Sequence, residues 1–235
     1  MTVDIIFAAE SVRAEAVSGK TAVVIDVLRA SSVICSALAN GAKNVYPVLS
    51  PEEAFMLRNS MNTKEVLLLG ERNALPIDGF DFGNSPILFS KEAVKGKTLI
   101  MTTSNGTRAI RNAQSADYLY VASFLNCDAI LNTLEKHNDI VVVCSGTNNE
   151  FALEDSLCAG LIACELGRRE FRLSDAAIAM ASLYSSHKDG LQDFASRGKH
   201  YQRLLKLGLH EDLDYCFKLN VVSNVPQLHI DGAIR

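Results

Sequence analysis

The chain has 235 residues, of which 48% are hydrophobic and 21% are charged. This composition is typical of a globular protein with a core, and it excludes fibrous and disordered chains. The 23 Lys and Arg residues are outnumbered by 27 Asp and Glu, which gives a formal net charge of −4. Proteins that bind by covering nucleic-acid phosphates need the opposite sign, so we expect no nucleic-acid partner.

The cysteines and the apolar segments indicate the cellular setting. The six cysteines show no C-x-x-C spacing, and the first residues lack a signal-peptide pattern, so we expect reduced thiols and a cytoplasmic location. No apolar stretch approaches the roughly 20 residues that span a bilayer, so we expect no membrane partner. A homodimer is the base-rate expectation for the assembly.

Short apolar runs of strand length recur in the first two thirds of the chain. They cover residues 3–8, 21–27, 44–48, 66–69, 98–101, 118–122 and 140–144. Helix-like segments lie between several of them, at residues 32–40, 51–61, 106–113 and 128–136. Most runs are continuous, which is typical of parallel strands buried on both faces. The pattern predicts an α/β fold with three layers, α/β/α, around a mostly parallel, mixed central sheet.

Two regions depart from this alternation. Residues 70–90 contain three glycines and two prolines and are too long for an ordinary connection, so we expect an ordered active-site loop. From about residue 151 the pattern is more helical, with helices at 152–166 and 175–186, a charged segment to about 219, and a late strand near 221–230. Because no linker separates these parts, we expect one domain over residues 1–235.

Three predicted strands end in polar turns that suit an anion. Asp26 is followed by Arg29 and Ser31, the strand at 98–101 precedes S-N-G-T-R, and the strand at 140–144 precedes S-G-T-N-N. In an open α/β sheet, ligands bind beyond the carboxyl ends of the strands, where loops and helix N-termini offer backbone N–H groups. The three ends together predict an enzyme that acts on a small, highly charged molecule.

Asp26 stands three residues before Arg29. A carboxylate at such a strand end can bind Mg²⁺ or attack phosphorus, and the arginine can hold an oxyanion with two parallel hydrogen bonds. The D-x-D phosphatases need a second Asp where this chain has Leu28, so a metal ligand is favoured over a nucleophile. The alternative is a plain cap for the helix that begins near Ser31.

Further acidic residues stand near other strand ends. Glu71 follows the strand at 66–69, and Glu154 and Asp155 begin the helix after the third polar turn. Acids early in a helix are commonly only dipole partners. Carboxylates from different strand ends also build Mg²⁺ sites, and here we prefer Asp155 to Glu154. We therefore predict Mg²⁺ as the cofactor, with Asp26, Glu71 and Asp155 as its ligands.

Other familiar sites are disfavoured. Cys144 resembles the nucleophile of a cysteine phosphatase, but Glu150 stands where that loop needs an arginine, so we expect a buried strand end. H-E-x-x-H, Walker and G-x-G-x-x-G motifs are absent from the sequence, and no histidine is singled out. These absences disfavour zinc hydrolases, nucleotide triphosphatases and dinucleotide enzymes.

An ordered set of blocks resembles the 2-phosphosulfolactate phosphatase family. The blocks are I-D-V-L-R-A-S at 25–31, G-E-R at 70–72, G-F-D-F-G-N-S-P at 79–86, T-S-N-G-T-R at 103–108, C-S-G at 144–146 and E-D at 154–155. The resemblance covers roughly residues 5–165. It implies a Mg²⁺-dependent acid phosphatase of three-layer α/β/α fold that hydrolyses 2-phosphosulfolactate to sulfolactate and phosphate on the route to coenzyme M.

The residue patterns and the resemblance lead to one set of expected roles, with a small anionic molecule as the substrate. We expect catalytic roles for Asp26, Arg29 and Arg108, and substrate contacts from Ser31, Arg72, Ser104, Asn105, Gly106, Thr107, Ser145, Gly146 and Thr147. Two alternatives remain open at this point. One is a metal-dependent lyase or transferase acting on a phosphorylated acid, and the other is a protein that binds small sulfonate or phosphate anions without turnover.

Overall fold

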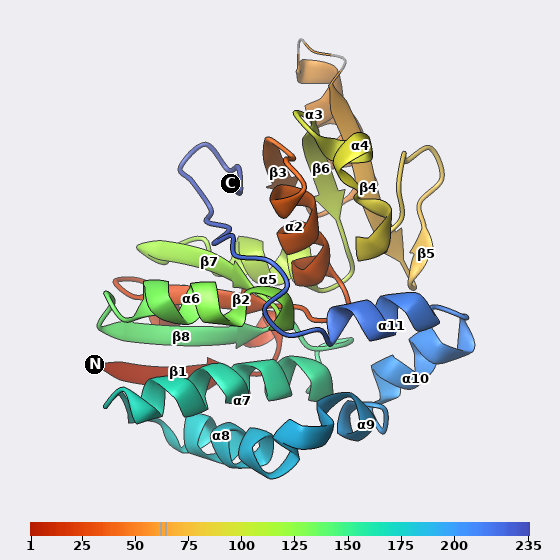
Figure 1. The fold of residues 1–235 in the computed structure, drawn as a ribbon. Coiled ribbons are helices and arrows are strands. Elements are labelled where there is room, and N and C mark those ends of the chain that lie inside the picture. The colour runs from red at the N-terminus through yellow and green to blue at the C-terminus, as the bar shows by residue number, and fades with distance from the viewer. Residues whose placement is uncertain (62, 64) are drawn as a thin grey trace.

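The computed structural model describes residues 1–61, 63 and 65–235. Its first sheet has five strands, which are all parallel and lie across the lower half of Figure 1. Their order is β7 (Tyr118–Ala122), β2 (Thr21–Ile25), β8 (Asp139–Cys144), β1 (Thr2–Ile6) and β9 (Arg172–Leu173). The expected α/β fold with a mostly parallel sheet is confirmed.

A second, four-stranded sheet stands upright in the upper half of Figure 1. Its order is β3 (Asn44–Pro47), β6 (Thr98–Thr102), β4 (Val66–Arg72) and β5 (Leu75–Pro76). The first three strands are parallel, and β5 turns back antiparallel to β4. This division into two sheets could not be predicted from the sequence, because strands of both sheets have similar apolar patterns.

The central strands are apolar on both faces because each face of a sheet meets a different core. On β2, Val23 and Ile25 belong to one hydrophobic cluster, whereas Ala22 and Val24 belong to another. The second cluster also contains Leu69 from the other sheet, so it lies between the two sheets. Side chains of successive strand residues point to opposite faces, which explains this alternation.

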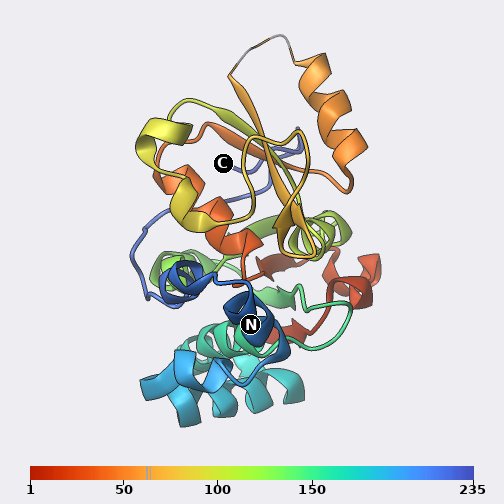
Figure 2. The same cartoon turned by 90° about the vertical axis from the view of Figure 1, so that its right-hand side faces the viewer.

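The helices fill the layers around these sheets (Figure 2). One face of the first sheet packs against α6 (Cys127–Leu134), α7 (Leu153–Arg168) and α8 (Asp175–His187). Its other face contacts α2 (Ala30–Ala39) and α5 (Gly106–Asn112), and α3 (Pro51–Ser60) packs on the second sheet. Shorter helices are α1 (Ala14–Val17) and α4 (Lys91–Val94). Among the described residues, none of the helices has both the length and the hydrophobicity that a membrane-spanning segment requires.

The last third of the chain differs from expectation. The predicted charged segment forms three helices, α9 (Leu191–Ala195), α10 (Lys199–Lys206) and α11 (His210–Cys216). The predicted strand near 221–230 is wrong, since these residues form only isolated bridges such as Tyr120 to Gln227. Pro226 has no N–H to donate to a ladder, which limits pairing there. That the whole chain is one domain stays a prediction.

The strand register decides where a site can form. Ile25 of β2 pairs with Ala122 of β7 and with Cys144 of β8, so three strands end together. In the second sheet, Gly70 of β4 pairs with Thr102 of β6. The loops after these five strands therefore emerge at two sheet edges, and helices α10 and α11 lie beside them (Figure 1).

Candidate active site

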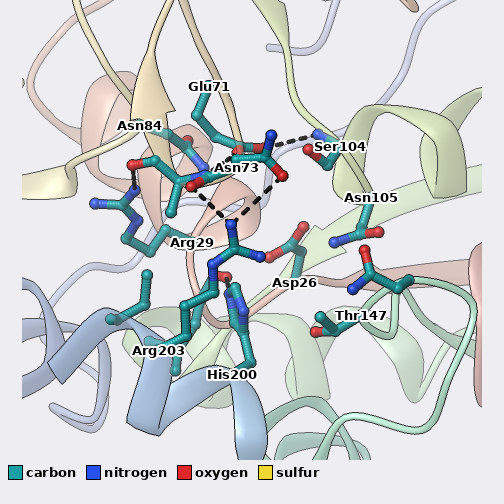
Figure 3. Close-up of a pocket in the computed structure, with 14 residues that line it drawn as sticks. Asp26, Arg29, Glu71, Asn73, Asn84, Ser104, Asn105, Thr147, His200 and Arg203 are labelled. Atoms are coloured by element: carbon teal, nitrogen blue, oxygen red, sulfur yellow. Dashed lines mark hydrogen bonds between the residues drawn. The ribbon is translucent and has the colours of Figure 1, made fainter. Parts of the chain in front are cut away.

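A small polar pocket with a cavity volume of about 30 Å³ opens beyond these strand ends. Six of the predicted site residues line it, namely Asp26, Arg29, Glu71, Ser104, Asn105 and Thr147. They come from the loops after β2, β6 and β8 and from the end of β4 (Figure 3). The expected convergence of strand ends on one site is therefore present for these residues.

Asp26 is the first residue after β2 and is only 7% exposed. Its Oδ1 accepts a hydrogen bond from the backbone N–H of Ala30, at 3.2 Å. Burial raises the pKa of Asp26 from 3.8 to about 7, the Ala30 hydrogen bond opposes the rise, and nearby Glu71 adds to it. The buried negative charge is therefore costly until a cation or a proton balances it.

Gly106, the first residue of α5, packs directly on Asp26. A Cβ at this position would lie 2.5 Å from Asp26 Oδ2 and 2.4 Å from the Cβ of Ala30. Such distances are far below ordinary contact, so only glycine allows α5 to approach the carboxylate. The structure thus gives Gly106 a packing role beside the pocket, whereas a direct contact with substrate stays a prediction.

Glu71 lies near the end of β4 and is 8% exposed. Its Oε1 accepts from the backbone N–H of Ser104, and its Oε2 accepts from that of Ala74, both at 2.7 Å. Asn73 and Ala74 have φ values of 58° and 67°, as the two central residues of a type I′ turn require. Glu71 therefore joins the β4–β5 turn to the β6 loop and holds its carboxylate at the pocket.

Arg29 lines the pocket but is already engaged with protein groups. Its Nη1 donates to Asp212 of α11, and its Nη2 donates to the carbonyl oxygen of Ala74 at 3.2 Å. Asp212 also accepts from Ser85 Oγ at 2.6 Å, and both members of the ion pair are nearly inaccessible. In this arrangement Arg29 connects α2, the β4–β5 turn and α11. The predicted clamp on substrate oxygens stays a prediction.

Asp155 does not line the pocket. Its Oδ1 accepts from the N–H of Val27 at 2.8 Å, and its Oδ2 accepts from the N–H of Gly146 at 3.0 Å. Burial, with Asp26 and Glu154 adding to it, raises the pKa of Asp155 well above its usual range. Asp155 therefore connects the loops after β2 and β8, and its role as a metal ligand stays a prediction.

The remaining predicted substrate contacts fall into two groups. The hydroxyls of Ser31 and Thr107 are buried in local bonds, to the backbone of Asp26 and of Thr103 respectively. Ser145 is also buried, and its Oγ has no partner among the described residues. None of these three residues lines the pocket with Asp26, and all three are buried.

Gly146 follows Ser145 in a tight turn. Its φ is 67°, and a Cβ there would lie 2.4 Å from the carbonyl oxygen of Glu150. Glycine is the residue that accepts both conditions. The turn brings Thr147 to the pocket, while Cys144 before it is fully buried and has a pKa raised well above its usual range by burial and by Asp155. The expectation that Cys144 is a buried strand end is confirmed.

Arg72 and Arg108 line an adjoining cavity rather than the pocket itself. The two cavities share Ser104, Asn105 and Asn148. Arg72 donates to Thr102 Oγ1 at 2.9 Å, and Arg108 forms a half-exposed ion pair with Glu10. These arginines thus add positive charge beside the pocket, at its β6 side.

Several pocket residues were missed from the sequence. They are Asn73, Ala74 and Asn84 from the 70–90 loop, and His200 and Arg203 from α10. Arg203 Nη2 donates to the carbonyl oxygen of Asn73 at 3.0 Å, across the pocket opening (Figure 3). No motif spacing marked α10, because its residues reach the site only through packing. The 70–90 segment does border the pocket, as expected for an active-site loop.

The two carboxylates of the pocket, Asp26 and Glu71, are compatible with Mg²⁺. Among the described residues no group of three or more His, Cys, Asp or Glu side chains could hold a metal ion. Mg²⁺, however, is usually held by one or two carboxylates and completes its six ligands with water and substrate phosphate. Asp26 and Glu71 line the same pocket, and the charge of Glu71 adds to the rise that burial causes in the pKa of Asp26, so a shared cation would stabilise both.

The fold is of the α/β class, and its polar pocket lies beyond the strand ends, where enzymes of this class bind small molecules. The model of the 2-phosphosulpholactate phosphatase family matches residues 6–230, and the chain belongs to this family of phosphoric monoester hydrolases. This match is longer than the resemblance found from the sequence blocks, which covered roughly residues 5–165, and it includes α10 and α11.

Three relatives illustrate the likeness, each named a probable 2-phosphosulfolactate phosphatase. The protein of Clostridium novyi (strain NT) is 46% identical over 97% of both chains. That of Clostridium acetobutylicum is 45% identical over 97% of both chains. That of Clostridium perfringens (strain SM101 / Type A) is 48% identical over 96% of this chain and 92% of its own.

Proposed function

We propose that this protein hydrolyses 2-phosphosulfolactate, or a similar small phosphorylated hydroxy acid, in a Mg²⁺-dependent reaction. The observation that carries the proposal is the pair of buried carboxylates, Asp26 and Glu71, in one polar pocket bordered by Arg203. Family membership supports the reaction class, and the names of the relatives support the substrate. Placement of the reaction on the route to coenzyme M is a further proposal.

Asp26 and Glu71 are the residues that would hold the cation. Once bound, Mg²⁺ would neutralise charge on the phosphoryl oxygens, which is where the reaction builds negative charge. The hydrogen bonds from Ser104 and Ala74 to Glu71 fix its carboxylate before any ligand arrives. Asp26 is fixed in the same way by Ala30 and by contact with Gly106. Preorganised groups of this kind supply most of the catalysis in phosphoryl transfer.

The rest of the pocket would bind the substrate. Asn105, Ser104 and Thr147 present amide and hydroxyl groups to it, and Arg203 brings a guanidinium. Arg72 and Arg108 in the adjoining cavity suit the second acidic group that such a substrate carries. A three-carbon molecule with phosphate, sulfonate and carboxylate groups needs this many cationic and polar contacts.

The test is release of inorganic phosphate from 2-phosphosulfolactate, measured with Mg²⁺ and after its removal by EDTA. We expect Mg²⁺-dependent release, and a loss of about 100-fold or more in Asp26→Asn, because a preorganised charged group of the site is removed. Asp117→Asn, an exposed residue before β7 at the opposite ends of the strands, serves as control. Tight sulfolactate binding without phosphate release would instead favour a binding protein.

A further inference from the structure

His200 lies in the first turn of α10, between two cavities. It lines the pocket that contains Asp26 and Glu71, and it also lines a neighbouring cavity bordered by Phe151 and Glu154. Figure 3 shows its ring at the pocket, below the guanidinium of Arg203. No histidine was expected in the site from the sequence.

The hydrogen bonds of the ring assign its proton. Nε2 lies 2.7 Å from the carbonyl oxygen of Leu28, and because a carbonyl oxygen can only accept, Nε2 carries the proton. Nδ1 is then a hydrogen-bond acceptor. It is buried and has no partner among the described residues. A buried acceptor without a donor needs an explanation, and a ligand in the pocket would supply the donor.

The charges around His200 favour its neutral form. Burial lowers the pKa of the ring, and Arg29 from the β2 loop and Arg203 from α10 lower it further. The hydrogen bond to Leu28 and the charge of Glu71 from β4 act in the opposite direction. A neutral imidazole keeps the Nδ1 lone pair that can take a proton.

We propose that His200 Nδ1 orients the water that attacks phosphorus and accepts its proton, an inference that rests on the proposed phosphatase activity. As the water oxygen bonds to phosphorus, its O–H bond breaks and the proton moves to Nδ1. The phosphorus–ester oxygen bond breaks, and the hydroxy acid leaves with the electron pair and takes a proton from solvent. Nδ1 returns its proton to solvent, so that phosphate and hydroxy acid are the only products.

The competing explanation is that His200 only anchors the Leu28 carbonyl. His200→Gln separates the two roles, because its side-chain N–H₂ can replace the Nε2 donor while no acceptor of a proton remains. We expect kcat to fall about 100-fold or more, KM to change by no more than a few-fold and the melting temperature to stay unchanged. Exposed His210, at the start of α11, gives the matched control His210→Gln, which should keep full activity.

A second measurement uses His200→Ala with added imidazoles of different basicity. We expect partial recovery of phosphate release, with a rate that rises with the pKa of the imidazole, as proton transfer requires. Wild-type kcat in His200→Gln, or recovery that is independent of basicity, would overturn the inference and leave the proposed function standing. If the wild-type protein released no phosphate from 2-phosphosulfolactate, both proposals would fall together.

Discussion

Gly106→Ala tests whether the close packing of α5 on Asp26 is required. The added Cβ would lie 2.4 Å from Ala30 Cβ and 2.5 Å from Asp26 Oδ2. Ordinary contact between carbons is about 3.5–4.0 Å, so the start of α5 must move about 1 Å from α2, or the carboxylate must rotate away. Neither Ala30 nor Asp26 has a long flexible side chain that could relieve the contact cheaply.

The expected effects follow from this displacement. Overpacking of this kind costs about 1–3 kcal/mol of unfolding free energy. A shift of about 1 Å in a catalytic group costs about 100-fold in rate. We therefore expect Gly106→Ala to lower kcat by about two orders of magnitude while the protein still folds. Urea unfolding and phosphate release under the same conditions measure the two effects.

Gly190→Ala is the matched control, because a Cβ at position 190 meets nothing within 4 Å and its φ of −152° lies outside the left-handed region that favours glycine. It should change the unfolding free energy by no more than about 0.5 kcal/mol and leave kcat unchanged. If Gly106→Ala and Gly190→Ala behaved alike in both assays, the packing of α5 on Asp26 would not matter to the site.

Three further predictions concern charge. Burial raises the pKa of Asp26 to about 7 in the folded protein, so its stabilising effect is full below pH 3.8 and is lost as the pH rises through 7. In EDTA, Asp26→Asn should therefore lose less unfolding free energy than the wild type between pH 5 and 8. Equal losses of the two proteins in urea unfolding would contradict this. Mg²⁺ at 100 times its dissociation constant should raise the unfolding free energy of the wild type by about 2.7 kcal/mol. If Mg²⁺ raised the melting temperature of the double variant Asp26→Asn, Glu71→Gln as much as that of the wild type, Asp26 and Glu71 would not be its ligands. Asp212→Asn removes the charged partner of buried Arg29 and should lower the unfolding free energy by about 3–5 kcal/mol. Glu10→Gln breaks the half-exposed ion pair with Arg108 and should lower it by only about 0–1 kcal/mol. Similar losses of the two variants in urea unfolding would refute the distinction.

The main elements and part of the site could be predicted from local patterns. Continuous apolar runs mark strands that are buried on both faces, and the turns after them concentrate the polar residues. Asp26 and Glu71 were predictable because a carboxylate at the end of a parallel strand must emerge at the ligand-binding edge of a sheet. The sequence placed glycines 106 and 146 in the polar turns, whereas the close approach that requires a glycine at each position is a matter of tertiary contact.

Other expectations required the packed structure. The sequence could not tell a substrate-binding arginine from a buried structural one, and Arg29 is paired with Asp212, which lies 183 residues further along the chain. Asp155 shows the same problem for carboxylates, because only tertiary contacts reveal that it lies outside the lining of the pocket and connects the loops after β2 and β8. Side-chain type limits what a residue can do, and its neighbours decide which of those roles it has.

Sequence patterning by itself determined the α/β class, the strand ends that carry the site and the family. These features follow from local periodicity and from residues close together in the chain, where the physics is short-range. The division of the strands between two sheets is visible only in the tertiary structure, and so is the position of His200 and Arg203 of α10 in the same pocket as Asp26. Such contacts depend on how distant helices pack, and residues spaced without a motif give no local signal of them.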